Sequence, residues 1–177
     1  GTVIAFMKMS NFKIWKIRPL NLLATIYVEV LRGTPLLLQL YFFYFLMPKL
    51  VPALGDKKTS ILVALIVNSA AYVAEIVRSG IMAVDPGQAE AARCLGLSQS
   101  QTMTKIIIPQ AVKNILPAMG NELVMMLKET SLASTFYLGE IMSQQKIIGG
   151  ATYLQIETLI ISAILYLVLT ASVSKLV

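Results

Sequence analysis

The sequence has no histidine, a single cysteine and few charged residues, which make up 14% of its 177 positions. One cysteine cannot build an internal disulfide framework, and without histidine a zinc cluster or histidine-based catalysis is excluded. Soluble domains carry about 25% charged residues. The shortage of charge therefore argues against an ordinary soluble domain.

Familiar catalytic motifs are also missing. The chain has no G-x-x-x-x-G-K-[ST] loop to hold ATP phosphates, no H-E-x-x-H and no G-x-S-x-G. We therefore assign it no catalytic residue, no metal ligand and no cofactor of its own. The net charge of +6 is interpreted as a signal of membrane topology rather than of nucleic-acid binding. The sequence therefore predicts a protein that forms a transport pathway, or a subunit of a transporter, rather than an enzyme. Any energy that transport uses would come from an ion gradient or from a partner.

What the sequence does have is apolar residues, at 56% of positions and a mean hydropathy of +0.73. A helix needs about 20 residues to cross a bilayer. We expect an interfacial helix over 21–33 and a mixed segment over 128–151 that could re-enter the membrane. The four segments that approach spanning length are 34–48 with an extension toward Ala53, 61–84, 105–127 and 153–173.

Local signals place the ends of these segments. Thr34 is expected to cap the first complete span, with Pro35 in its first turn. Asp85-Pro86-Gly87 should end the second span, and Pro109, Pro117 and Gly120 should kink or break the third. We treat 1–177 as one transmembrane domain. The short apolar run at 1–7 predicts that the earlier part of a first span is missing, and the basic end that begins at Lys175 predicts a C-terminal tail that is cut short.

Basic residues predict the orientation, because cytoplasmic loops carry an excess of Lys and Arg. A cluster of basic residues precedes the first complete span and places that side of the span in the cytoplasm. The loop over 54–60 is then outside, although it also holds Lys57 and Lys58. The segment over 85–104 is back in the cytoplasm, with Arg93 and Lys105. The cluster that precedes the first complete span is Lys8, Lys13, Lys16, Arg18 and Arg32.

The second span carries a polar stripe formed by Asn68, Tyr72, Glu75 and Ser79. Their spacing of 4, 3 and 4 places them within about 60° of one another on a helix. An ionisable group in a span costs roughly 3 kcal/mol, so it normally faces a partner or a water-filled path. One interpretation is helix–helix contact, with Glu75 paired to Arg78. The other is a substrate path, to which we assign this stripe together with Ser69.

The third predicted span is also rich in polar residues. Discontinuous helices free backbone groups that can bind a substrate, so we expect a pathway or gate role for part of 121–135, with Lys128, Thr130 and Ser131 as gate residues. The alternative is a kink that only shapes packing. The polar residues of this stretch are Lys113, Asn114, Asn121, Glu122, Lys128 and Glu129.

The polar stretch between the second and third spans carries the most specific pattern. Glu90-Ala91-Ala92 is followed after three residues by Gly96, and after nine more by Ile106-x-Ile108-Pro109. This spacing resembles the EAA loop of ABC importer permeases, with Ile108 in place of the usual Leu. The stretches EVLRGTPLLLQ (29–39), NSAAYVAEIVRSGI (68–81) and KETSL (128–132) look like the polar amino acid permeases of that superfamily.

The resemblance implies an all-α, polytopic transmembrane bundle of the type I ABC importer kind, with a five-helix core. It implies that 85–104 is a cytoplasmic coupling segment that docks on a separate ATPase dimer, which binds ATP and Mg²⁺. Small alanines would permit close approach to a groove wall, and charged side chains would contact its rim. The alternative, a solvated surface helix, does not require this spacing. The residues assigned to coupling are Glu90, Ala91, Ala92, Arg93, Gly96 and Leu97.

The resemblance further implies a multi-pass protein of the bacterial plasma membrane that imports polar amino acids of the glutamine, glutamate or basic type. Its expected partners are a second permease subunit, identical or paralogous, and an extracytoplasmic substrate-binding protein or a fused binding domain. Two alternatives stay open at this point. One is an ABC permease for another small polar solute, such as an osmolyte, and the other is a secondary transporter or channel that works without an ATPase.

Overall fold

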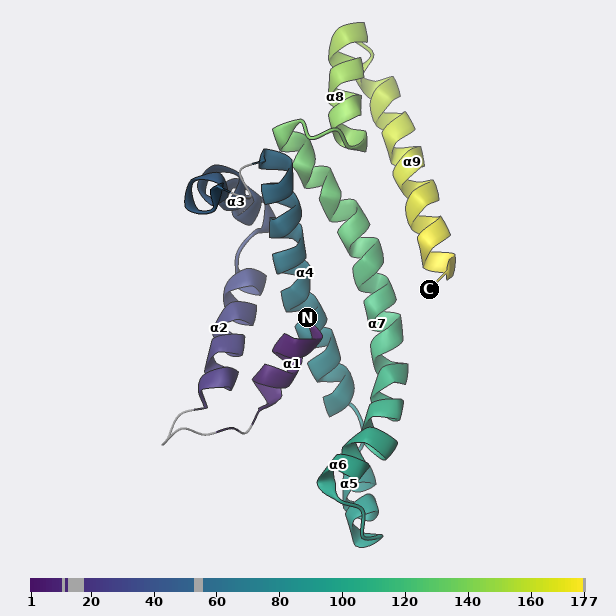
Figure 1. Ribbon diagram of the computed structural model, residues 1–177. Helices are drawn as coiled ribbons and strands as arrows, with labels where there is room; N and C mark the ends of the chain where they lie inside the picture. The colour runs from purple at the N-terminus through teal and green to yellow at the C-terminus, as the bar shows by residue number, and fades with distance from the viewer. Residues whose placement is uncertain (11, 13–17, 53–55, 177) are drawn as a thin grey trace. The chain divides into compact units, whose positions relative to one another are not determined.

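The computed structural model describes the whole chain except residues 11, 13–17, 53–55 and 177 (Figure 1). Lys13 and Lys16 of the basic cluster, and the expected end of the first span near Ala53, lie outside the described residues. The described chain is helical and contains no strand, as predicted. The helices are α1 (Thr2–Met9), α2 (Pro19–Gly33), α3 (Leu36–Leu50), α4 (Lys57–Met82), α5 (Pro86–Cys94), α6 (Gln99–Thr102), α7 (Ile108–Glu129), α8 (Ile141–Thr152) and α9 (Gln155–Leu176), with a π-helix over Met103–Ile107 and a 3₁₀ helix over Thr130–Phe136.

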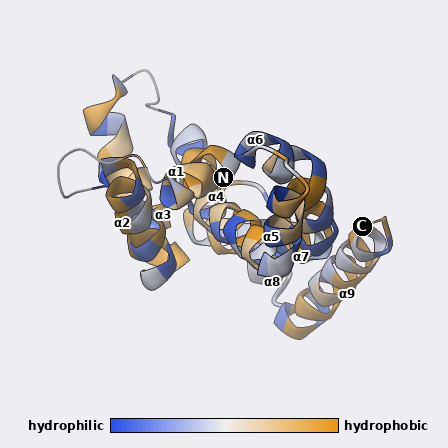
Figure 2. Ribbon diagram, turned by 90° about the horizontal axis from the view of Figure 1, so that it is seen from below, coloured by the Kyte–Doolittle hydropathy of each residue, from blue (hydrophilic) through white to orange (hydrophobic). Residues whose placement is uncertain are grey.

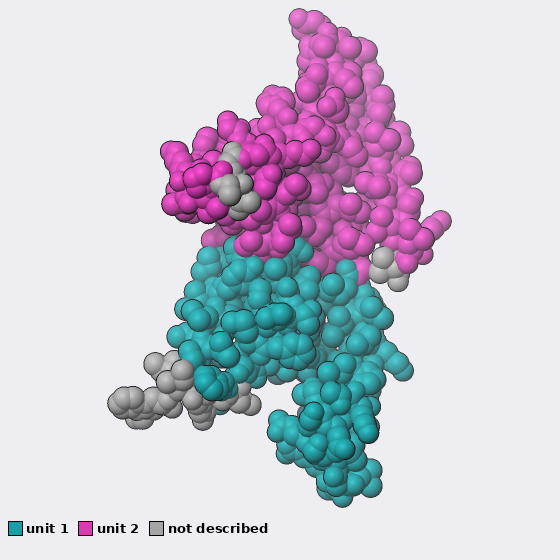
Figure 3. All heavy atoms as spheres, in the orientation of Figure 1, with its two compact units in different colours: residues 1–33, 68–119 teal, residues 34–67, 120–177 magenta. Residues whose placement is uncertain are grey.

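Two compact units make up the chain, and Figure 3 colours them separately. Unit 1 holds residues 1–33 and 68–119, and unit 2 holds residues 34–67 and 120–177. The boundaries fall inside α4 and α7, so each of these helices contributes residues to both units.

The core of unit 1 is made of small and β-branched side chains. Ala71 and Ala74 of α4, Val28 of α2 and Ala5 of α1 are fully buried. Because alanine has a short side chain, α1 and α2 approach α4 closely, and the first residue of the chain already lies against Val73. On α7, Ile115 lies against Gly80 of α4, where a larger residue than glycine would collide with it.

Unit 2 has its own core, in which Leu40 of α3 packs with Ile61, Ala64 and Leu65 of α4 and with Ala133 of the 3₁₀ helix. Aromatic rings extend this core, with Tyr44 of α3 4.5 Å from Phe136 between ring centroids. The long helix α9 is mostly orange to white in Figure 2, with hydrophilic residues toward its ends, and most of its side chains are exposed.

Among the described helices, α4 and α9 are long and apolar enough to cross a membrane, and a third candidate arises if α2 and α3 are counted as one broken span. The predicted segments 61–84 and 153–173 correspond to these two helices. The predicted interfacial helix over 21–33 is α2. The mixed segment over 128–151 forms the 3₁₀ helix and most of α8.

Two expectations about helix ends are wrong. Thr34 does not cap α3, because Pro35 is the N-cap in an extended conformation and offers no side-chain hydrogen bond. The Thr34 hydroxyl instead accepts a bond from the Gln39 side chain at 2.8 Å. The third span was expected to be kinked or broken, and a break is absent at Pro117 and Gly120, since both lie inside the single helix α7. Pro109 is the second residue of α7 and follows the π-helix over Met103–Ile107 directly.

The start of α4 is held by Asp56, whose carboxylate accepts bonds from the backbone N–H and the hydroxyl of Thr59, both at 3.0 Å. These bonds stabilise the charged form and lower the pKa of Asp56. The first turn of α4 is thus capped by a side chain outside the apolar segment.

Candidate functional site

Three of the five predicted pathway residues line one cavity of unit 1. Tyr72, Glu75 and Ser79 of α4 face a space of about 370 Å³. They share a face because their spacing follows the turns of the helix. The remaining wall comes from α2, the rest of α4 and its end, and α7, through Arg32, Ile76, Gly80, Ala83, Asn114 and Ala118.

Asn68 and Ser69 are not among the residues that line this cavity. Asn68 is buried, with 2% of its surface exposed, one turn of α4 before Tyr72. The polar stripe is therefore divided, with Asn68 packed inside the protein and the other three members at an open space. The burial of Asn68 is consistent with the helix–helix interpretation, and the substrate path remains a prediction for the members at the cavity.

Glu75 lies between two cations. Its carboxylate accepts a bond from Lys8 Nζ at 3.1 Å and bonds from the Arg78 guanidinium, one of them from Nε at 3.0 Å. The pair with Arg78 was predicted from the spacing of three residues, and the structure confirms it. Lys8 also lies 3.8 Å from a carboxylate oxygen of Glu29. A single lysine of α1 thus links α2 and α4.

Sequence reasoning missed the roles of Lys8, Arg32 and Asn114. Lys8 is 67 residues from Glu75, so no local spacing could connect them. The Arg32 guanidinium lies over the ring of Tyr72, 5.4 Å from its centroid. The Asn114 amide donates to the carbonyl of Gly80 at 3.4 Å. The one available signal was that Arg32 lies in the stretch EVLRG, which resembles the permeases.

The predicted coupling segment forms a short capped helix. Asp85 accepts a bond from the N–H of Gly87 at 2.8 Å, and Pro86 occupies the first turn of α5. Gly96 follows the helix with a φ of +83°, the left-handed conformation that ends many helices. A glycine therefore makes the turn that ends α5.

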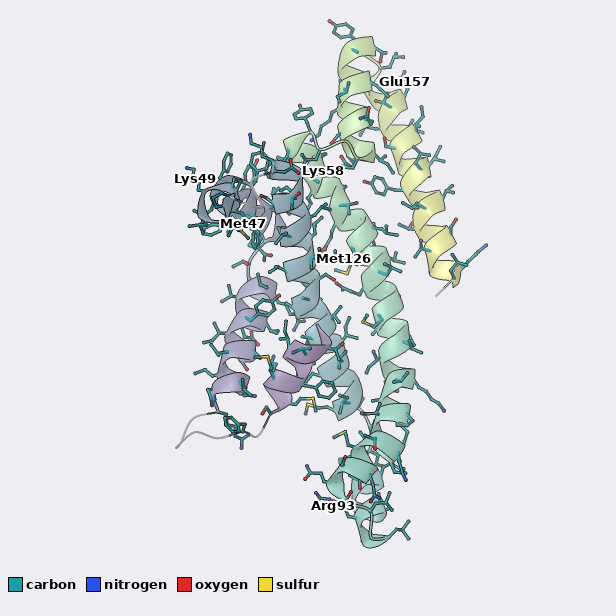
Figure 4. All side chains as sticks on the ribbon, in the orientation of Figure 1. Met47, Lys49, Lys58, Arg93, Met126 and Glu157 are labelled. Atoms are coloured by element: carbon teal, nitrogen blue, oxygen red, sulfur yellow. The ribbon has the colours of Figure 1, made fainter. Side chains whose placement is uncertain are left out.

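The side chains assigned to coupling differ in exposure. Ala92 is buried against unit 1, whereas Ala91, Glu90 and Arg93 are exposed and Leu97 is half-buried. Figure 4 shows Arg93 at the end of unit 1 that carries α5 and α6. One polar face of α5 is therefore accessible to a partner while its other face anchors it.

Two features join this segment to α7. Gln110 donates from its side chain to Gln88 at 3.2 Å. Between α6 and α7 the helix widens into a π-helix over Met103–Ile107, a local form that is often found at functional sites. The segment over 85–104 is thus connected to α7 by a bond and by continuous helical backbone.

The predicted gate residues lie in unit 2. Thr130 begins the 3₁₀ helix, donates to the carbonyl of Leu127 at 2.7 Å and lines a cavity of about 540 Å³. Ser131 is half-buried and Lys128 is exposed, and neither is among the residues that line this cavity. Within the described ranges, no group of three Cys, Asp or Glu residues could hold a metal ion.

Comparison with known proteins gives a consistent picture. Residues 3–177 match the family described as binding-protein-dependent transport system inner membrane component. An arginine transport system permease protein of Bacillus subtilis (strain 168) is 44% identical over 169 residues, covering 96% of this chain and 75% of the relative. A putative glutamine transport system permease protein of Rickettsia bellii (strain RML369-C) is 41% identical over 177 residues, covering 98% and 79%.

Solved structures agree with these relatives. The crystal structure of an amino acid ABC transporter with histidines has a chain that is 48% identical, with a TM-score of 0.85, over 98% of this chain and 78% of that one. A chain of the methionine ABC transporter in inward-facing conformations is 17% identical, with a TM-score of 0.70, over 98% of this chain and 88% of that one. At that identity the second match shows the fold alone.

Proposed function

Since the chain belongs to the family of binding-protein-dependent transport system inner membrane components, we propose that it is the permease subunit of an ATP-driven importer of polar amino acids. The observation that carries this proposal is its similarity, along almost its whole length, to permease proteins named for arginine and glutamine transport. A multi-pass position in the bacterial plasma membrane is part of the proposal and is supported by the apolar helices α4 and α9.

The second part of the proposal is that α5 docks on a separate ATPase. A short helix with exposed Glu90 and Arg93, and with the small, exposed Ala91 between them, fits a groove with a charged rim. The expected groove contact of Ala92 does not fit, because that side chain is buried. The ATPase would bind ATP and Mg²⁺, and this chain would hydrolyse nothing itself. Closure of the ATPase would move α5 as a lever, and the bond between Gln88 and Gln110 would pass that movement to α7.

The third part is that the cavity of unit 1 forms a section of the substrate path. Tyr72, Glu75 and Ser79 bring an aromatic ring, a carboxylate and a hydroxyl to one open space, and such convergent polar groups are typical of ligand sites. Thr130 at its own cavity in unit 2 supports a role for the 3₁₀ segment as a gate. A second permease subunit and an extracytoplasmic binding protein would complete the importer.

The test is reconstitution of the chain with its ATPase and binding protein in proteoliposomes. We expect uptake of labelled arginine or glutamine that requires ATP on the side of the membrane where the ATPase lies. Uptake should stop when ATP is replaced by a non-hydrolysable analogue. Glycine betaine, an osmolyte, serves as the comparison solute. Uptake driven by an ion gradient without ATP would contradict the proposal. Uptake of betaine in place of the amino acids would show that the transported solute is an osmolyte.

A further inference from the structure

We infer that the cavity of unit 1 binds the α-carboxylate of the transported amino acid through Arg32. This inference rests on the proposed function, because it identifies which part of the cargo one wall of the path recognises. Arg32 lies in the last turn of α2 and lines the cavity together with Tyr72, Ser79 and Asn114.

The charged groups at the cavity favour an anionic ligand. Its lining contains one carboxylate, Glu75, and one guanidinium, Arg32. Glu75 is already bonded to Lys8 and Arg78, so its negative charge is compensated from outside the lining. None of the ion pairs found among the described residues involves Arg32. The cavity therefore presents a net positive wall, which favours an anionic group over a cationic one.

The position of Arg32 suits a carboxylate. A guanidinium stacked on an aromatic ring keeps its N–H donors in its own plane, where they remain available to a ligand. The Arg32 Cζ lies 5.4 Å from the centre of the Tyr72 ring, close enough for the ring to attract the guanidinium. A planar fork of donors matches a carboxylate in a bidentate pair, which is among the strongest hydrogen-bonded contacts in proteins.

Neutral groups beside Arg32 can complete the site. Ser79 brings a hydroxyl, and Asn114 uses one N–H on the Gly80 carbonyl, which leaves its second N–H and its oxygen. The volume of about 370 Å³ is at the lower end of the range of about 300–1,000 Å³ for small-molecule pockets. A single amino acid, rather than a peptide or a nucleotide, is the cargo that this size indicates.

The test measures binding to the permease–ATPase complex in nanodiscs without the binding protein, so that only the membrane site contributes. The probes are labelled L-arginine and L-glutamine, each compared with its decarboxylated amine, agmatine or 4-aminobutanamide. We expect the wild-type complex to bind the amino acids about 10- to 100-fold more tightly than the amines, from the strength of hydrogen bonds to charged groups. Arg32→Gln should reduce that ratio to about one, while amine binding stays unchanged.

Two further variants control for folding and for charge. Arg32→Lys keeps the charge without the planar fork and should keep part of the preference. Arg18→Gln removes an exposed arginine that precedes α2 and should leave the preference intact. All variants are checked for assembly with the ATPase by size-exclusion chromatography.

The outcomes separate the two proposals. If an assembled Arg32→Gln complex keeps the wild-type preference for the carboxylate, the inference is wrong while the proposed function holds. If neither amino acid binds and neither is taken up by the full importer, both are wrong. A lipid carboxylate is the other source of this chemistry. If the Arg32→Gln complex no longer binds phosphatidylserine but still prefers the amino acids over the amines, Arg32 binds a lipid and the inference is overturned.

Discussion

At the scale of single residues, Glu75 shows how a charge is accommodated within an apolar helix. Its side chain is 17% exposed and that of Lys8 is 14% exposed, so water screens their attraction only in part. Arg78 contributes the second cation from one turn away. The three side chains connect α1 to α4, and their shared role is to hold unit 1 together beside the cavity.

A double-mutant cycle on Lys8→Met and Glu75→Gln measures this link. We expect each single change to lower the free energy of unfolding by on the order of 1 kcal/mol, because each removes a partly buried charged hydrogen bond. The double variant should lose less than the sum. Thermal unfolding of the purified complex in detergent is the measurement, and strictly additive losses would show that the pair is uncoupled. The same Glu75→Gln variant tests the predicted substrate role, which unchanged amino acid affinity would contradict.

Gly96 is the second residue on which function should depend. Its φ of +83° disfavours any side chain, although no atom lies within 4 Å of where a Cβ would be. We expect Gly96→Val to cost roughly 1–2 kcal/mol locally and to redirect the chain after α5, so that transport is lost and ATPase activity is uncoupled while membrane insertion is kept. ATP hydrolysis and uptake are measured together.

A matched control exists for Gly96. Gly139 has a φ of +73° and equally open surroundings, so Gly139→Val introduces the same backbone strain away from α5. It should leave the stimulation of ATPase activity in place. Normal transport by Gly96→Val would remove the main support for the coupling role of this segment.

At the scale of elements, α5 is a helix of 9 residues that is too short to be stable by itself. The helix is stabilised by three contacts: Asp85 caps its first turn, its own Ala92 side chain is buried, and its Gln88 side chain accepts a hydrogen bond from Gln110 of α7. The helix is therefore positioned by its surroundings and remains open on its outer face. Such an element can carry a displacement without changing its own shape.

Removing the cap tests that view. Asp85→Ala should destabilise α5 by about 1 kcal/mol and weaken binding of the ATPase several-fold, because part of the binding free energy would then go into ordering the helix. Asp56→Ala removes the comparable cap of α4 and serves as the control. Hydrogen exchange of the α5 amides measures the stability of the helix in each variant. Titration with the ATPase measures how tightly each variant binds it. Equal losses of ATPase binding in both variants would contradict a local role for the Asp85 cap.

At the scale of the whole molecule, the proposal requires opposite sides of the membrane for the start of α4 and for α5. Cys94 is the single cysteine of the chain and is exposed at the end of α5. We expect a membrane-impermeant maleimide to label it in inside-out vesicles but not in intact cells. In a Cys94→Ala background, Lys58→Cys should show the reverse pattern. Labelling of both sites from one side would contradict the predicted orientation.

Much of this arrangement was predictable from local patterns. The cap at Asp85, the turn at Gly96 and the pairing of Glu75 with Arg78 each depend on residues within four positions of one another, where helix geometry alone dictates the contact. The errors at Thr34 and at Pro117 have a common cause. Both expectations treated proline as a boundary, whereas α7 continues through Pro117 and Pro35 itself takes the N-cap position of α3.

The sequence by itself determined that this is a helical membrane protein, that a polar segment with a spaced motif separates two apolar helices, and which face of α4 is polar. Those features follow from hydropathy, from periodicity and from a spaced motif. Only the tertiary structure decided that Lys8 compensates Glu75, that Asn68 is packed inside while Tyr72 lines a cavity, and that Arg32 remains the cation of that cavity. These outcomes depend on contacts between α1, α2, α4 and α7, whose partners lie tens of residues apart and leave no periodic signal in the chain.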